Sequence, residues 1–151
     1  LSRLRAMIRG ASPLVGATAH AIAAGARSPA EQVSRVFETV QRRMRYVPDE
    51  LDAEVIQTPD RLVYLIATEG GAEGDCDDYV SLLGALLFAL GIPVTLVAVA
   101  VDRPDGVWDH LYLAAMVDGA RVPLDPIPTV PWPMGEEIPA EEVTSRIEVR
   151  V

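Results

Sequence analysis

The clearest periodic pattern lies between residues 29 and 45, where apolar side chains recur at helical spacing. These apolar positions are Val33, Val36, Phe37, Val40 and Met44. Ser28 precedes Pro29, and Glu31 follows, which is a typical helix start because the serine hydroxyl can accept a bond from a free backbone N–H. The pattern predicts an amphipathic helix over residues 29–45.

Two further helices are expected before the middle of the chain. The run Gln57-Thr58-Pro59-Asp60 predicts the start of a short helix that continues through Ala67. Residues 69–75 are rich in glycine and predict a loop. No Lys-Ser/Thr pair follows this loop, so we do not expect it to bind phosphate. Residues 76–90 are apolar all round and predict a helix buried on most faces, which Gly91 ends.

The second half of the chain predicts strands. Residues 95–101 are almost wholly apolar and β-branched, as in a central strand buried on both faces. After a turn at residues 103–106, a strand over 108–117 and a strand over 120–125 flank Asp118-Gly119, a typical two-residue hairpin turn. The proline-rich tail, residues 126–145, predicts irregular structure, and residues 146–151 predict a last short strand. No linker divides the chain, so we expect a single domain over 1–151.

Composition excludes several functions. The chain has 151 residues, of which 50% are hydrophobic, so it can form a full core. Its formal net charge of −9 argues against nucleic acid as a partner, because phosphate binding needs a basic face.

No run approaches the ~20 apolar residues of a membrane span. Polar residues, glycine and proline interrupt the apolar N-terminal segment, so we expect no signal peptide. A cytoplasmic location is favoured and a periplasmic one is the alternative.

The only cysteine of the chain, Cys76, directly begins the buried helix. It cannot form an internal disulfide. The first turn of a helix favours a thiolate, and its free N–H groups can bind an oxyanion. Three acids, Asp75, Asp77 and Asp78, have the opposite effect on the thiol, which a protonated His110 would compensate. Helix capping is the favoured role of these acids. The alternative is that Asp75 and Asp77 bind calcium, which prefers oxygen ligands.

The hairpin places a histidine beside an aspartate. If Asp118-Gly119 is a two-residue turn, Val117 pairs with Ala120, and His110 then lies diagonal to Asp125 on the same sheet face. A one-residue slip of register would send Asp125 to the opposite face. The register that the turn favours therefore also brings an imidazole within reach of a carboxylate. A cysteine at a helix start, followed by His and Asp on paired strands, predicts a Cys-His-Asp nucleophilic site made of Cys76, His110 and Asp125.

Other residues have a weaker connection to the site. A lone buried cysteine is usually a small hydrophobic side chain, and His110 alone could be a core histidine. Gln57 could donate its amide to the oxyanion, and Tyr46 could line the site, although packing or capping would explain either residue equally well. His20 is expected to be structural, and Trp108 and Trp132 are expected to form cover or cleft wall.

These motifs resemble the transglutaminase-like superfamily of cysteine proteases and acyltransferases. The resemblance lies in Gly74-Asp75-Cys76-Asp77-Asp78-Tyr79, His110-Leu111-Tyr112 and Val122-Pro123-Leu124-Asp125-Pro126. The segments 45–49 and 54–59 and Gly91 are similar to bacterial and phage-borne members, and the resemblance covers residues 29–126. It implies an α+β, papain-like core, with the catalytic helix packed on an antiparallel sheet. It also implies that Cys76 is the nucleophile, His110 the base and Asp125 the residue that orients the base.

The resemblance implies acyl transfer from a protein or peptide substrate. In one calcium-dependent periplasmic branch, acids at the positions of Asp75 and Asp77 bind calcium; no other cofactor is implied. The eukaryotic crosslinking enzymes carry an aromatic residue after the cysteine, where this chain has Asp77. We therefore expect a thiol protease or amidase. The alternatives are a catalytically silent scaffold, for example of phage or prophage assembly, and an amine acyltransferase.

Overall fold

The computed structural model describes residues 1–48, 55–101, 108–130 and 132–151. Five α-helices of the described chain precede most of its strands: α1 (Ser2–Arg9), α2 (Pro13–Ala23), α3 (Pro29–Arg43), α4 (Pro59–Glu69) and α5 (Cys76–Ala89). The strands are β1 (Met44–Tyr46), β2 (Ala72–Gly74), β3 (Val94–Val101), β4 (His110–Val117), β5 (Ala120–Leu124) and β6 (Val143–Arg150). The expected turn at residues 103–106 lies outside the described residues.

The helix starts follow the capping signals in the sequence. The Ser28 hydroxyl accepts a hydrogen bond of 3.2 Å from the Glu31 N–H at the start of α3. The Thr58 hydroxyl accepts one of 3.3 Å from the Arg61 N–H at the start of α4. Helix α3 ends at Arg43, two residues before the expected end, because Met44 is extended and begins β1. Helix α4 continues to Glu69, and Gly70 ends it in the left-handed conformation, with φ of 83°.

Part of the expected glycine-rich loop is a strand. Residues 72–74 form β2, which pairs with β1 in a two-stranded parallel sheet, Arg45 opposite Glu73. The expectation of a loop over 69–75 was wrong for these three residues. Their sequence, Ala-Glu-Gly, has no β-branched side chain, so the strand depends on its partner β1 rather than on its own propensity.

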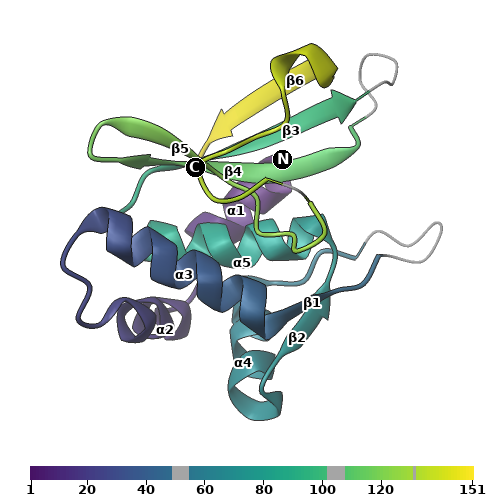
Figure 1. Cartoon of the computed structure of the whole chain (residues 1–151). Coiled ribbons are helices and arrows are strands. Elements are labelled where there is room, and N and C mark those ends of the chain that lie inside the picture. Colours follow the sequence, from purple (N-terminus) through teal and green to yellow (C-terminus); the bar gives the residue numbers. More distant parts are fainter. Residues whose placement is uncertain (49–54, 102–107, 131) are drawn as a thin grey trace.

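Helix α5 lies at the centre of the molecule. Its residues from 78 to 87 are all buried, which confirms the expected buried helix. Helices α1, α2, α3 and α4 contact α5, and the large sheet covers another side of it (Figure 1). A Cβ atom on Gly84 would lie 2.7 Å from Ile8 Cδ1, so the glycine allows α1 to approach α5 closely. None of the helices in the described ranges is both long and apolar enough to cross a membrane.

The four-stranded sheet has the order β5-β4-β3-β6, and each strand pairs antiparallel with its neighbour. Asp118 and Gly119 both have positive φ, 51° and 82°, as a tight two-residue hairpin turn requires. Val117 pairs with Ala120, and the ladder continues to Leu113 opposite Leu124. The register expected from the turn chemistry is therefore confirmed.

The two faces of this sheet pack differently. Leu96, Ala98, Leu111 and Leu113 belong to the main core, together with α5. The opposite face forms a second, smaller cluster of Val97, Val99, Tyr112 and Ala114, against which Ile138 and Val143 pack. Strand β3 is buried on both faces, as expected. The tail is mostly irregular, but a 3-10 turn at Ala140–Glu142 leads into β6, which starts three residues before the expected strand.

Candidate active site

Cys76 is the first residue of α5, and the helix cap around it comes from Asp75. The Oδ1 atom of Asp75 accepts hydrogen bonds from the Asp77 N–H (3.1 Å) and the Asp78 N–H (3.4 Å). Asp75 therefore satisfies two of the N–H groups that a helix start leaves without partners.

The surroundings of Cys76 favour the neutral thiol. Burial, together with the charges of Asp77 and Asp75, raises the pKa of the Cys76 thiol to about 12. The backbone N–H groups of Asp77 and Cys76 act in the opposite direction but are outweighed. The expected effect of the helix start is therefore present, but burial and the two neighbouring acids have the larger effect on the pKa of the thiol. The thiol needs a base or a cationic partner to give up its proton.

His110 and Asp125 are hydrogen-bonded to each other. The Nε2 atom of His110 contacts Oδ2 of Asp125, although the two residues come from neighbouring strands. The other carboxylate oxygen, Oδ1, accepts a bond of 3.2 Å from the Ile127 N–H. The Asp125 side chain is only 3% exposed, so both of its oxygens are held in place in a buried setting. This pairing leaves Nδ1 as the ring nitrogen of His110 that can act on another group.

The thiol and the imidazole line the same cavity. It has a volume of about 260 Å³, and both Cys76 and His110 contribute to its wall. The thiol donates a hydrogen bond of 3.9 Å to Asp77 Oδ1, whereas the hydrogen bond of the His110 ring goes to Asp125. In the described structure, His110 is therefore hydrogen-bonded to Asp125, and Cys76 and His110 line the same cavity.

Several residues of this wall were missing from the sequence prediction. They are Leu1, Arg3 and Leu4 from the N-terminal region, Ile56, Asp109, Leu111 and Ala98. The spacing of Leu4 and Ile8, both buried, is the signal that could have placed the first helix against the core. Trp108, expected to be cover or cleft wall, does line the cavity and is 44% exposed.

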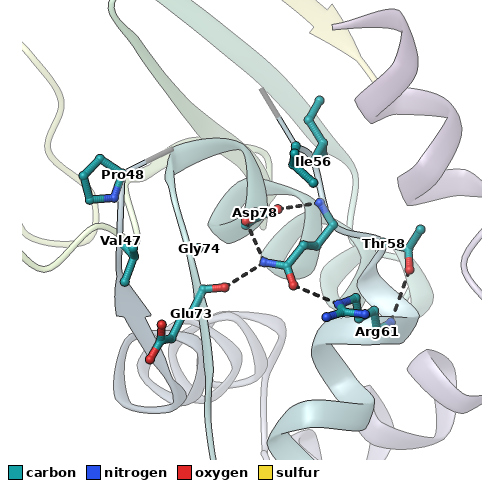
Figure 2. Close-up of a pocket in the computed structure, with 10 residues that line it drawn as sticks. Val47, Pro48, Ile56, Thr58, Arg61, Glu73, Gly74 and Asp78 are labelled. Carbon is teal, nitrogen blue, oxygen red and sulfur yellow. Dashed lines mark hydrogen bonds between the residues drawn. The ribbon is translucent and has the colours of Figure 1, made fainter. Parts of the chain in front are cut away.

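Gln57 lies in a different, neighbouring pocket of about 680 Å³, whose wall includes Ile56, Glu73 and Asp78 (Figure 2). Its Nε2 donates to the Glu73 carbonyl oxygen (2.7 Å) and to Asp78 Oδ2 (2.9 Å), and its Oε1 accepts from Arg61 Nε (3.2 Å). Both amide hydrogens are therefore used within the fold. The amide connects the segment before α4 to β2 and α5, and an oxyanion role for Gln57 stays an untested prediction.

A buried carboxylate explains why Gln57 is held so firmly. Asp78 is 1% exposed, and its Oδ1 also accepts from the Gln57 backbone N–H at 2.7 Å. A buried carboxylate needs such donors to replace water. A Cβ on Gly74 would lie 2.3 Å from Asp78 Oδ2, so this glycine makes room for the carboxylate.

Tyr46 lies at the end of β1, with its ring 6.4 Å from the ring of Tyr79 and tilted by 42°. It is not among the residues that line the cavity of Cys76 and His110. The structure thus places Tyr46 in an aromatic contact with α5 rather than in the wall of this cavity.

The acids around Cys76 already have hydrogen-bonding roles at the start of α5. No group of three His, Cys, Asp or Glu side chains in the described part of the chain is arranged to hold a metal ion. Asp75 Oδ1 is used by the helix cap, and Asp77 Oδ1 accepts from the thiol. The residues thus fit helix capping better than calcium binding, which stays an untested prediction for Asp75 and Asp77.

Comparison with known proteins agrees with this geometry. A family model of the transglutaminase-like superfamily matches residues 16–126, a segment that includes Cys76, His110 and Asp125. No curated protein sequence matches the chain.

Two solved structures share the fold. A putative protease from Parabacteroides distasonis has a TM-score of 0.67 and 18% identity over 81% of this chain and 25% of its own. A putative cysteine protease from Cytophaga hutchinsonii has a TM-score of 0.58 and 15% identity over 91% of this chain and 47% of its own. The chain thus spans less than half the length of either protein, and at these identities the likeness shows the fold alone. The family match covers most of the sequence, so the chain belongs to the transglutaminase-like superfamily.

Proposed function

We propose that this domain is a thiol-dependent hydrolase, a cysteine peptidase or amidase, that acts by acyl transfer. Cys76 is the nucleophile, His110 the base and Asp125 the residue that orients the base. The observation that supports this best is the hydrogen bond between His110 Nε2 and the buried Asp125, beside a cavity that the Cys76 thiol also lines. A buried carboxylate bonded to one imidazole nitrogen fixes the tautomer and leaves the other nitrogen to move a proton.

The chemistry follows from these roles. His110 Nδ1 takes the proton of the thiol, and Cys76 Sγ attacks the carbonyl carbon of a peptide or side-chain amide. The Cys76 N–H at the start of α5 would bind the oxyanion of the tetrahedral intermediate. His110 then gives its proton to the leaving amine, and an acyl thioester remains on Cys76. Water adds to this thioester, His110 accepts one of its protons, and the carboxylic acid leaves while the thiol is restored.

His110 is essential to this scheme because of the raised pKa of the thiol. With the pKa of its thiol raised to about 12, Cys76 stays protonated near neutral pH and needs a base to take its proton. An imidazolium beside the sulfur offsets the charges of Asp75 and Asp77 and makes the ionised thiol accessible. Asp125 in turn stabilises that imidazolium through the hydrogen bond at Nε2.

Two observations favour the second candidate, a catalytically silent scaffold. The thiol donates its hydrogen bond to Asp77 rather than to His110, and the pKa of the thiol is high. A silent domain would keep this state, whereas an active one must bring the proton of the thiol to His110 when substrate is bound. Catalytic hydrogen bonds are often long in a free enzyme and tighten in the complex.

Product analysis distinguishes the candidates. We expect a mixture of unmodified peptides, incubated with the protein and a labelled primary amine, to give new free carboxyl groups, read by mass spectrometry. Hydrolysis is expected because no motif for a second, amine substrate is recognisable in the sequence. Incorporation of the amine in preference to hydrolysis would instead identify an acyltransferase, and the absence of either product would favour the silent scaffold.

A further inference from the structure

The imidazole of His110 has a second neighbour besides Asp125. Tyr112 lies two residues further along β4, on the same sheet face, and its ring is stacked against that of His110. The ring centroids are 6.0 Å apart and the planes differ by 24°. Tyr112 is 1% exposed, so its ring has a fixed place in the smaller core cluster. A fixed aromatic ring against the imidazole limits the directions in which the imidazole can turn.

The Tyr112 ring is held at its far end by a carboxylate from the C-terminal tail. The Tyr112 hydroxyl donates a hydrogen bond of 2.7 Å to Glu137 Oε2. Arg121 on β5 donates to both oxygens of Glu137 at 3.1 Å, and Arg146 on β6 donates to Oε2 at 3.0 Å. Glu137 thus joins the tail to three strands of the sheet. The hydrogen bond holds the hydroxyl end of the ring in place, and packing in the smaller core cluster limits rotation of the ring about its long axis.

A second carboxylate completes the cluster without contacting Tyr112. Glu148 Oε1 accepts from Arg146 Nε at 2.8 Å and from Arg121 Nη2 at 3.2 Å. The two arginines therefore lie between Glu137 and Glu148. Both carboxylates bind the same two cations, but only Glu137 reaches the tyrosine. This difference provides a matched pair of positions for a test.

The charges agree with a stable, ionised Glu137. Burial alone would raise the pKa of Glu137, but hydrogen bonds from Tyr112, Arg146 and Arg121 outweigh it and lower the pKa. Burial and the bond to Glu137 raise the pKa of the Tyr112 hydroxyl, which therefore stays a donor. A neutral hydroxyl that donates to a carboxylate is among the stronger protein hydrogen bonds.

We propose that Tyr112 and Glu137 are positioning residues that hold the His110 ring toward Asp125 and the cavity of Cys76. Glu137, Arg146 and Glu148 lie beyond the segment that the family model matches, residues 16–126, so the tail of this chain contributes to the order of its site. The inference rests on the proposed function, because it assigns a role to residues that act through His110.

The test measures the rate at which iodoacetamide alkylates Cys76 as a function of pH in the whole chain. Removal of the hydroxyl in Tyr112→Phe, or of the carboxylate in Glu137→Ala, is expected to move the profile to higher pH by about one unit. The rate of Cys76 alkylation near neutral pH should then fall on the order of tenfold. This is less than the loss of about 10²-fold that a 1 Å misplacement of a catalytic group can cause. Glu137→Gln can still accept from Tyr112 and should stay closer to the parent profile.

The control is Glu148→Ala, which removes a carboxylate from the same two arginines without contacting Tyr112. Its melting temperature can fall, but its alkylation profile should match the parent. The inference is overturned if the alkylation profiles of Tyr112→Phe and Glu137→Ala are the same as that of Glu148→Ala. This holds even if the melting temperatures of the two variants fall. Failure of the proposed function would give a different result. The parent and His110→Ala would then have the same alkylation profile, without any substitution at Tyr112 or Glu137.

Discussion

Replacement of Cys76 by serine is expected to abolish acyl transfer and leave the fold intact. A serine hydroxyl is far less acidic than a thiol, and its oxygen is a weaker nucleophile than sulfur in this setting. Removal of the nucleophile from a serine-protease triad costs on the order of 10⁶ in turnover. The side chains are nearly isosteric, so the free energy of unfolding should change by no more than ~1–2 kcal/mol. Peptide hydrolysis and thermal unfolding, measured on the same preparation, check both parts.

Cys76→Ala serves as the matched variant, because it removes the nucleophile without adding a hydroxyl near Asp77. Both variants should be inactive to the same degree and should unfold cooperatively. Turnover that survives in either variant would show that the reaction does not pass through a thioester on Cys76.

Replacement of Asp125 by asparagine is expected to cause the second largest loss. Asparagine has the same shape, and its oxygen can still accept from the Ile127 N–H as Oδ1 does now. Its amide would donate to His110 Nε2, which favours the wrong tautomer and withdraws the charge that stabilises the imidazolium. The same change in a serine-protease triad costs about 10⁴ in turnover. A cysteine site that works partly as an ion pair should lose less, so we expect a loss of about 10²- to 10³-fold.

Asp118→Asn is the matched control for this variant. Asp118 lies in the hairpin turn with positive φ, a conformation that asparagine tolerates, and the change in charge is the same. It should keep parental turnover. Equal turnover of Asp125→Asn and the parent would mean that the His110–Asp125 bond is structural rather than catalytic.

Local chemistry explains why the hairpin and its pair were predictable. Asp118 and Gly119 are residues that accept positive φ, and a two-residue turn defines the pairing of both strands. With that register, His110 and Asp125 must share a face, which the hydrogen bond between them confirms. Helix α5 was predictable for a similar reason, since an apolar run of its length needs burial on most sides.

The parts that could not be predicted depend on contacts between distant segments. Gln57 looked free to act on a substrate because nothing in its own segment shows that the acceptors for its amide come from Glu73 and Asp78. Strand β2 forms only because β1 is beside it. The pKa of Cys76 depends mainly on how deeply the thiol is buried, a property of the packed molecule that the helix start does not reveal.

The central claim is that His110 makes the thiol of Cys76 reactive, and alkylation by iodoacetamide near neutral pH tests it most directly. His20→Ala is the control, because His20 is the other of the two histidines and is exposed on α2. The account predicts rapid labelling of Cys76 in the parent and in His20→Ala, and labelling at least about tenfold slower in His110→Ala, whose thiol has no imidazole to take its proton. Equal labelling rates in the parent and His110→Ala, both slower than the rate of a free thiol, would contradict the account. The silent scaffold would then be the remaining candidate.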